Sequence, residues 1–187
     1  MVKPTWDGTS DEELLRRFGE GDPRAFEELM RRYQRPIYNA AFWGLRRAED
    51  ANDVTQTVFL RVAERLDEYD PKYKFFSWIY RIAVNESLNL LRRNRHEDAL
   101  DDEIDIPDAE DANPEWRAGK AETSKRIQNA LMSMNTNDRT VLMLRHFSEC
   151  SYQEIGQILE LDEKTVKSRL FEARHRLAIL LKDLRRN

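Results

Sequence analysis

The sequence contains few of the residues that build disulfide-linked, collagen-like or mainly β proteins. Its 187 residues include one cysteine, six glycines and six prolines. A single cysteine cannot form an internal disulfide, and so little glycine and proline disfavours collagen-like and turn-rich β folds. No apolar run reaches the roughly 18 residues of a membrane-spanning helix. The N-terminus lacks the basic-then-apolar order of a secretory signal. We therefore expect a cytoplasmic protein without membrane insertion.

Basic residues are missing from one stretch of the chain. Residues 97–115 contain ten Asp or Glu and no Lys or Arg. Because the net charge of the whole chain is only −4, the remainder is net basic, and the overall acidity does not argue against a nucleic-acid partner. An acidic stretch with few large apolar residues cannot bury enough surface to offset its ordering entropy. We predict a flexible acidic linker at 96–116, between domains at 1–95 and 117–187.

Apolar residues elsewhere recur with helical spacing. Asp22 followed by Pro23 predicts an N-cap and a first helical turn. Pro36 is expected to interrupt or kink this helix, which then resumes to about Leu45. Ser77 is a plausible N-cap for a later helix that ends near residue 93. The predicted fold class is all-α, with two small helical domains.

A helix predicted over about residues 51–66 has an unusual polar side. At about 100° per residue, Asp53, Gln56, Thr57 and Leu60 fall opposite its apolar stripe. An exposed leucine can mark a partner-binding face, but a single one is usually ordinary surface. Both interpretations stay open on this feature alone.

The helix that follows residue 77 carries a mixed polar and aromatic sector. Trp78, Arg81, Asn85, Asn89 and Arg92 share it. Indole, amide and guanidinium groups stack on unpaired bases, hydrogen-bond base edges and neutralise phosphate. The alternative is that Trp78 and Tyr80 are core aromatics beside an ordinary solvated face. The preceding segment, residues 68–74, mixes tyrosine and lysine with a proline and should be an exposed loop.

The C-terminal domain has the pattern of a helix-turn-helix. Ser151 and Glu154 form a capping box for a short helix, and Asp162 caps a longer basic helix. Phe171 lies on the outer side of that second helix, among cations. Such a phenylalanine can contact a thymine methyl in the major groove while Lys and Arg hold phosphates. The alternative is that this basic helix packs on another protein.

Signatures of catalysis and of metal binding are weak. His146 and Cys150 have the spacing of two helical metal ligands, but zinc needs four and no other cysteine or paired histidine lies nearby. The sequence has no P-loop, no glycine-rich dinucleotide turn, no His-Glu-x-x-His and no convincing triad. We therefore predict no catalytic residue, no metal site, no cofactor and no enzymatic activity.

Five segments, taken in chain order, resemble bacterial sigma factors of the extracytoplasmic-function (ECF) group in the sigma-70 family. They are residues 22–29 (DPRAFEEL), 48–60 (AEDANDVTQTVFL), 76–85 (FSWIYRIAVN), 151–155 (SYQEI) and 165–174 (TVKSRLFEAR). The resemblance implies a dissociable RNA polymerase subunit that directs promoter recognition and DNA melting. Its first domain would be sigma region 2 and its second sigma region 4.

The resemblance also implies three binding surfaces. The core polymerase, through its β′ clamp coiled coil, would bind Asp53, Gln56, Thr57 and Leu60. The melted minus-10 element would bind Tyr69, Lys72, Tyr73, Lys74, Trp78, Arg81, Asn85, Asn89 and Arg92. The minus-35 duplex would bind Lys164, Thr165, Lys167, Ser168, Arg169, Phe171, Glu172 and Arg174, while the apolar side of region 4 meets the β flap. An anti-sigma factor is a further expected partner, and the free chain is expected to be a monomer.

Three positions depart from the family pattern. Glu160 stands where a turn glycine is common, so the inter-helix turn could be built differently. A segment beginning at Met134 replaces a usual Leu-Pro, with Asn137 or Asp138 available as the cap. Glu172 stands where many relatives carry arginine, and a carboxylate there repels phosphate but can accept a hydrogen bond from cytosine N4.

Two other functions remain as alternatives. One is a stand-alone two-domain helix-turn-helix regulator, which should bind its promoter tightly alone and dimerise on repeated half-sites. The other is a small-molecule-dependent enzyme with a DNA-binding tail.

Overall fold

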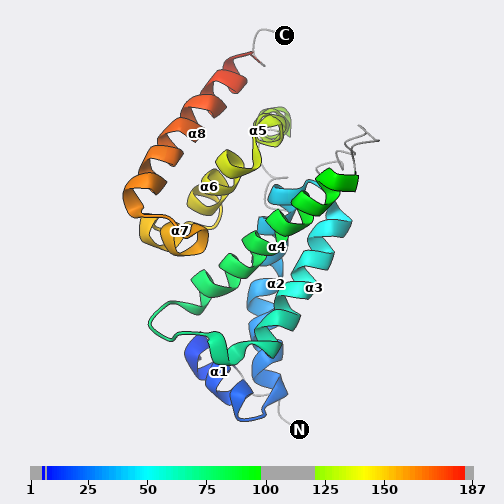
Figure 1. Cartoon of the computed structure of the whole chain (residues 1–187), viewed down its shortest axis with the longest axis vertical. Coiled ribbons are helices and arrows are strands. Elements are labelled where there is room, and N and C mark those ends of the chain that lie inside the picture. Colours follow the sequence, from blue (N-terminus) through cyan, green and yellow to red (C-terminus); the bar gives the residue numbers. More distant parts are fainter. Residues whose placement is uncertain (1–5, 7, 98–120, 184–187) are drawn as a thin grey trace.

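The computed structural model describes residues 6, 8–97 and 121–183, and every regular element within them is helical (Figure 1). The all-α prediction is therefore confirmed. The elements are α1 (Asp11–Gly19), α2 (Pro23–Leu45), α3 (Ala48–Glu64), the 3₁₀ helix η1 (Leu66–Glu68), α4 (Phe75–Glu97), α5 (Ala121–Ser133), α6 (Thr136–His146), α7 (Tyr152–Leu159) and α8 (Glu163–Asp183). Apart from its first two residues, the predicted linker lies outside the described residues.

The predicted interruption of the helix at Pro36 and the predicted N-cap at Ser77 are wrong. Asp22 does cap α2, because its Oδ1 accepts from the Arg24 N–H at 3.1 Å. However, α2 continues through Pro36 without a break, and buried Ile37 follows the proline directly. Tertiary packing thus offsets the hydrogen bond that proline removes. Ser77 is not the N-cap of α4, because the Lys74 carbonyl already accepts from the Ser77 N–H at 3.0 Å in the first turn.

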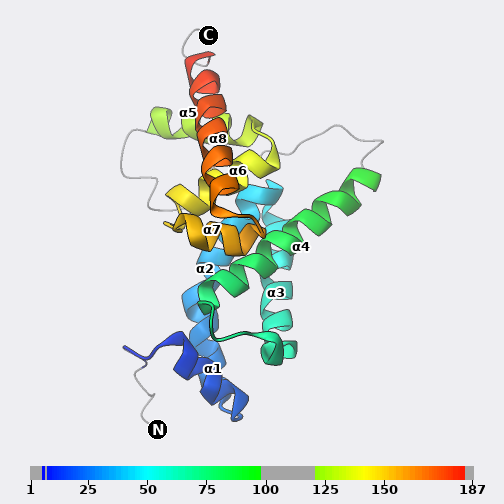
Figure 2. The same ribbon diagram turned by 60° about the vertical axis from the view of Figure 1, so that its left-hand side comes forward.

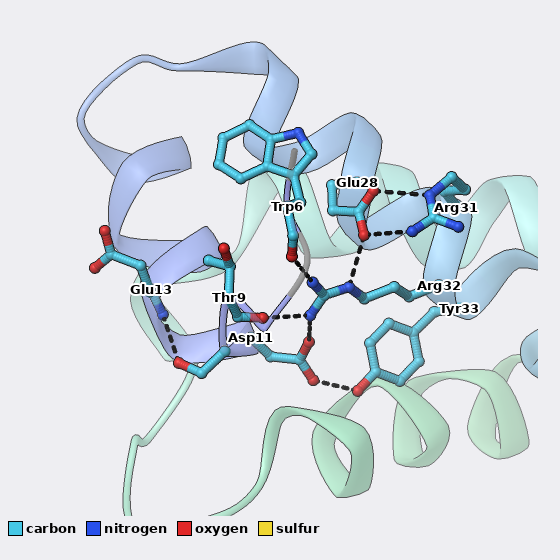
Figure 3. Close-up of polar contacts among 9 residues, drawn as sticks. Trp6, Thr9, Asp11, Glu13, Glu28, Arg31, Arg32 and Tyr33 are labelled. Atoms are coloured by element: carbon cyan, nitrogen blue, oxygen red, sulfur yellow. Dashed lines mark hydrogen bonds and ion pairs between the residues drawn. The ribbon is translucent and has the colours of Figure 1, made fainter. Parts of the chain in front are cut away.

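Helices α1 to α4 form one bundle, in which α1 packs across one end of α2 (Figure 1). A polar cluster holds α1 in place (Figure 3). The Arg32 guanidinium donates to the Thr9 carbonyl at 2.8 Å and to the Asp11 carboxylate at 2.9 Å. Tyr33 donates its hydroxyl proton to the same carboxylate. Because Arg32 and Tyr33 belong to α2, these bonds fix the orientation of α1.

Helices α5 to α8 form a second bundle that packs directly on the first. α7 packs against α4 and α6 packs against α2, as Figure 2 also shows. The rings of Trp43 in α2 and Phe147 after α6 are 5.9 Å apart. The buried apolar residues of the two bundles form one continuous core.

A buried arginine joins the two bundles. Arg139 in α6 is 2% exposed, and its guanidinium donates to the carbonyls of Trp43 and Gly44 in the last turn of α2, at 2.8 Å for Gly44. It also donates to the Met134 carbonyl at 3.0 Å after α5. A cation that bonds the terminal carbonyls of a helix also interacts favourably with its dipole. Burial and nearby Arg46 lower the pKa of Arg139 to about 10, so this guanidinium remains protonated at neutral pH.

Candidate nucleic-acid and polymerase interfaces

The predicted polymerase-binding face of α3 is on the surface. Leu60 is 62% exposed, Asp53 and Gln56 are exposed, and Thr57 is partly buried. Val58, on the opposite side of the same helix, is fully buried in the core. An apolar side chain this exposed beside polar residues is available to a partner.

The predicted minus-10 face of α4 is only partly accessible. Asn85, Asn89 and Arg92 are exposed, as predicted, and the Arg92 guanidinium donates to Asn89 at 3.1 Å. Trp78, however, is 7% exposed, which contradicts the prediction that it shares an open face. The interpretation of Trp78 and Tyr80 as core aromatics describes their burial correctly, because Tyr80 is 2% exposed.

The loop of residues 68–74 packs over Trp78 and explains its burial. The ring centroids of Tyr69 and Trp78 are 5.4 Å apart, and the Phe75 ring centroid lies 5.9 Å from each of them. The Tyr69 hydroxyl donates to the Tyr73 carbonyl at 2.7 Å and so closes the loop on itself. Tyr73, Lys72 and Lys74 remain exposed. The loop therefore presents cations and a tyrosine outward over an aromatic base.

Helix α7 of the second bundle covers the other side of this surface. Lys74 binds the Glu154 carboxylate at 2.7 Å, and Arg81 lies 3.8 Å from Glu160. The Lys74 ammonium in turn lowers the pKa of Glu154. Between the loop, α4 and α7 lies a cavity of about 470 Å³, and Trp78 and Ser77 line it. Part of the predicted minus-10 surface is thus occupied within the chain itself.

The helix-turn-helix forms as the sequence predicted. Ser151 and Glu154 make both bonds of the capping box, at 3.1 and 2.8 Å. Asp162 accepts from the Thr165 N–H at 2.8 Å and from the Thr165 hydroxyl at 2.6 Å. The Thr165 hydroxyl is therefore engaged in capping α8.

The turn itself keeps a left-handed residue although it lacks the usual glycine. Glu160 has φ 55° and ψ 46°, which is the conformation that glycine adopts most easily. The glycine that the structure requires is Gly156, because a Cβ atom there would lie 2.6 Å from the Leu161 carbonyl oxygen. The sequence alone does not indicate this role, since only the fold brings Leu161 onto Gly156.

The outward side of α8 carries the predicted minus-35 residues. Phe171 is 74% exposed, while Val166, Leu170 and Ala173 are buried on the opposite side. The remaining predicted residues on the exposed side are Lys164, Lys167, Ser168, Arg169, Glu172 and Arg174. α8 packs against α5, α6 and α7 and lies at the outer edge of the molecule (Figure 1). This side of α8 is open even while the bundles are packed together.

Two contacts lie at the two ends of α6, and the first corrects the predicted cap. The N-cap of α6 is Asn135, whose Oδ1 accepts from the Asp138 N–H at 2.9 Å; neither Asn137 nor Asp138 is the cap. His146 accepts a hydrogen bond from Arg174 at 3.3 Å, and burial together with this cation lowers the pKa of His146.

Neither metal ligation nor membrane insertion finds support among the described residues. Cys150 is 1% exposed, and no group of three or more His, Cys, Asp or Glu in residues 6, 8–97 and 121–183 could hold a metal ion. Over the same ranges no helix is both long and apolar enough to cross a bilayer.

Comparison with known proteins agrees with this geometry. The family model of Sigma-70 region 2 matches residues 29–97, and that of Sigma-70, region 4 matches residues 124–177. The chain is 30% identical to the ECF RNA polymerase sigma factor SigW of Bacillus subtilis (strain 168), across 91% of this chain and 96% of that protein. It is 34% identical to the ECF RNA polymerase sigma factor SigM of Mycobacterium tuberculosis (strain H37Rv), across 92% and 85%.

A solved structure shows the same fold over nearly the whole chain. It is that of CnrH in complex with the cytosolic domain of CnrY, with a TM-score of 0.69, 26% identity and coverage of 92% of this chain and 97% of CnrH. Both region models match in the expected order, the relatives match over most of their length, and the fold is the same. The chain therefore belongs to the ECF sigma factors of the sigma-70 family.

Proposed function

We propose that this sigma factor binds core RNA polymerase through α3 and promoter DNA through two separate surfaces. The observation that carries the proposal is the outward side of α8, where Phe171 is 74% exposed in a basic helix held by a capped turn. Exposing a phenylalanine to water is unfavourable unless a partner covers it, and a thymine methyl in the major groove is such a partner. The residues of α8 named above then bind the minus-35 duplex.

The melted minus-10 strand is the proposed ligand of the 68–74 loop and α4. Exposed Lys72, Tyr73, Asn85, Asn89 and Arg92 supply cations, amides and an aromatic ring. Stacking offsets the few kcal/mol that extruding a base costs, at about 1–3 kcal/mol per base.

Full use of that surface requires the two bundles to separate. Lys74 and Arg81 face Glu154 and Glu160 of the second bundle, and Trp78 lines the cavity between the bundles. We therefore propose that the packed arrangement is a resting form and that polymerase holds the bundles apart. The apolar side of region 4 would then contact the β flap of the polymerase.

The proposal extends to regulation and to the absence of catalysis. CnrH, which shares this fold, has been solved with the cytosolic domain of CnrY. By analogy, we propose that an anti-sigma factor binds this chain. In this proposal the chain is a monomer when free and a non-catalytic subunit when bound to polymerase, and it acts in the cytoplasm.

Run-off transcription with purified core polymerase tests the function. Leu60→Asp should abolish holoenzyme formation, measured by gel filtration with core, because it places a charge at an apolar contact. Lys167→Ala should leave holoenzyme formation intact but weaken promoter binding and lower its salt slope by about one. Asn85→Ala should permit binding and reduce strand opening, read by permanganate footprinting.

The controls separate this function from a stand-alone regulator. The exposed residue Glu27 lies in α2, away from the proposed polymerase-binding face of α3, and Glu27→Gln should behave as wild type. If the free chain bound a promoter tightly and the Leu60→Asp variant kept its transcriptional effect, the stand-alone regulator would be the better description.

A further inference from the structure

Glu172 occupies an unexpected place for an acid. It follows Phe171 directly, and its side chain is 57% exposed on the outward side of α8. A carboxylate that faces DNA repels phosphates and weakens sequence-independent binding. Glu172 can compensate for this cost where it accepts a hydrogen bond from a base.

The surrounding contacts hold this carboxylate in place. The Arg176 guanidinium donates to Glu172 at 3.1 Å and also donates to the Asp138 carboxylate. Asp138 is 10% exposed at its side chain and accepts from the Asn135 amide at 2.8 Å. Arg176 is thus anchored on α6 and orients Glu172 on α8.

The chemistry of the major groove identifies the base. A carboxylate only accepts hydrogen bonds, so its partner must present a donor. Guanine shows two acceptors there and thymine an acceptor and a methyl group, whereas adenine places its acceptor N7 beside the donor N6. Cytosine presents its N4 amino group as a donor without an adjacent acceptor of its own.

We propose that Glu172 selects a C·G pair within the duplex element that α8 reads, by accepting a hydrogen bond from cytosine N4. Arg176 is the positioning residue for this contact. The proposal rests on the proposed binding of the minus-35 duplex by α8. Because Phe171 is adjacent, a thymine should occur close to the selected cytosine.

Selection from randomised promoters tests the proposal. Holoenzyme assembled from the full chain and core polymerase is incubated with duplexes randomised across the upstream element, and bound DNA is sequenced. The wild type should enrich cytosine at one position by about tenfold. Glu172→Ala should lose that enrichment and keep the other positions. Glu172→Gln should admit adenine, since an amide pairs with N6 and N7 together.

Two further variants separate positioning from general charge. Arg176→Met should partially reduce the enrichment of cytosine and leave the enrichment of the neighbouring thymine unchanged. Glu163→Ala is the matched control. Like Glu172 with Arg176, Glu163 forms an ion pair with the residue four positions later in α8, and its carboxylate lies 2.6 Å from the Lys167 ammonium. Glu163→Ala should strengthen overall binding as Glu172→Ala does, yet select the wild-type motif.

The outcomes distinguish this inference from the function on which it rests. If Glu172→Ala selects the same cytosine as the wild type, or if Glu163→Ala also erases it, Glu172 does not read this pair and the inference is wrong. If the wild type selects no upstream motif and Phe171→Ala changes nothing, α8 does not read duplex DNA, and both proposals fail.

Discussion

At the scale of single residues, burial decides the chemistry of the one cysteine. Cys150 is 1% exposed, and burial raises the pKa of its thiol to about 12. The thiolate is the reactive form of cysteine. We expect native protein at pH 8 to resist iodoacetamide, while the same protein in denaturant is alkylated fully within the same time, as mass spectrometry would show. Rapid labelling of native protein would contradict the burial of Cys150.

The buried acid of α2 should make stability depend on pH. Glu28 is 6% exposed and binds Arg31 at 2.7 Å and Arg32 at 2.8 Å, and these arginines lower its pKa to about 2. Because the folded pKa lies below the unfolded value of 4.5, the contribution is complete above about pH 5 and is lost as the pH falls towards 2. It amounts to about 1–2 kcal/mol, since solvent screens the exposed Arg31.

Unfolding in urea at several pH values measures this contribution. Glu28→Gln should be less stable than wild type at pH 7, and the difference between them should shrink between pH 5 and 2.5. Glu27→Gln alters the exposed neighbouring acid and serves as the control. A difference that stays constant down to pH 2.5 would show that Glu28 acts through packing alone.

At the scale of elements, one close approach determines whether the helix-turn-helix can form. The Leu161 N–H donates to the Gly156 carbonyl at 2.9 Å, and the Leu161 carbonyl oxygen would lie only 2.6 Å from a Cβ of residue 156. We expect Gly156→Ala to destabilise the C-terminal bundle by about 2–3 kcal/mol, because backbone must move to admit the methyl group.

Thermal unfolding followed by circular dichroism measures this change. Gly19→Ala is the control, because a Cβ there would meet the Leu66 side chain at an ordinary 3.8 Å in the first bundle. It should be neutral or slightly stabilising, since alanine favours helices. Equal stability of Gly156→Ala and wild type would mean that the turn has another conformation.

The helix ends show which elements the sequence can predict. Asp22, Ser151 and Asp162 cap helices as expected, because a cap depends on a side chain and a backbone N–H only two or three residues apart. Ser77 failed as a cap because the chain begins α4 two residues earlier and buries its hydroxyl, which makes no hydrogen bond. Local sequence identifies a capping residue, but it does not say whether the residue will be buried.

At the scale of the whole molecule, Arg139 should control whether the bundles stay packed. Its guanidinium bonds carbonyls of α2, and Arg46 of the first bundle donates in return to the Met134 carbonyl at 3.1 Å. Arg139→Met keeps most of the apolar stem but leaves buried carbonyls without donors, which costs about 1–3 kcal/mol each. We therefore expect this variant to populate an open form with a larger radius of gyration in small-angle X-ray scattering.

A control and a readout of folding make this prediction specific. Arg169→Met removes an exposed arginine from α8 and should leave the radius unchanged. Far-UV circular dichroism should stay the same in both variants, which would show that the C-terminal bundle remains folded. A compact Arg139→Met variant would mean that the apolar contacts, such as Trp43 with Phe147, suffice to hold the bundles together.

The sequence by itself determined the helical fold, most helix starts, the exposed faces of α3 and α8 and the family to which the chain belongs. The helices, their starts and their exposed faces depend on spacing within one or two helical turns, so neighbouring residues carry the information. The family resemblance depends on five such local segments and on their order along the chain. Only the tertiary structure decided that Trp78 is covered, that Gly156 must lack a side chain and that Arg139 joins the bundles. Arg139 and its carbonyl partners in α2 are 95 and 96 positions apart. Contacts over such separations depend on how whole helices pack, which no local pattern specifies.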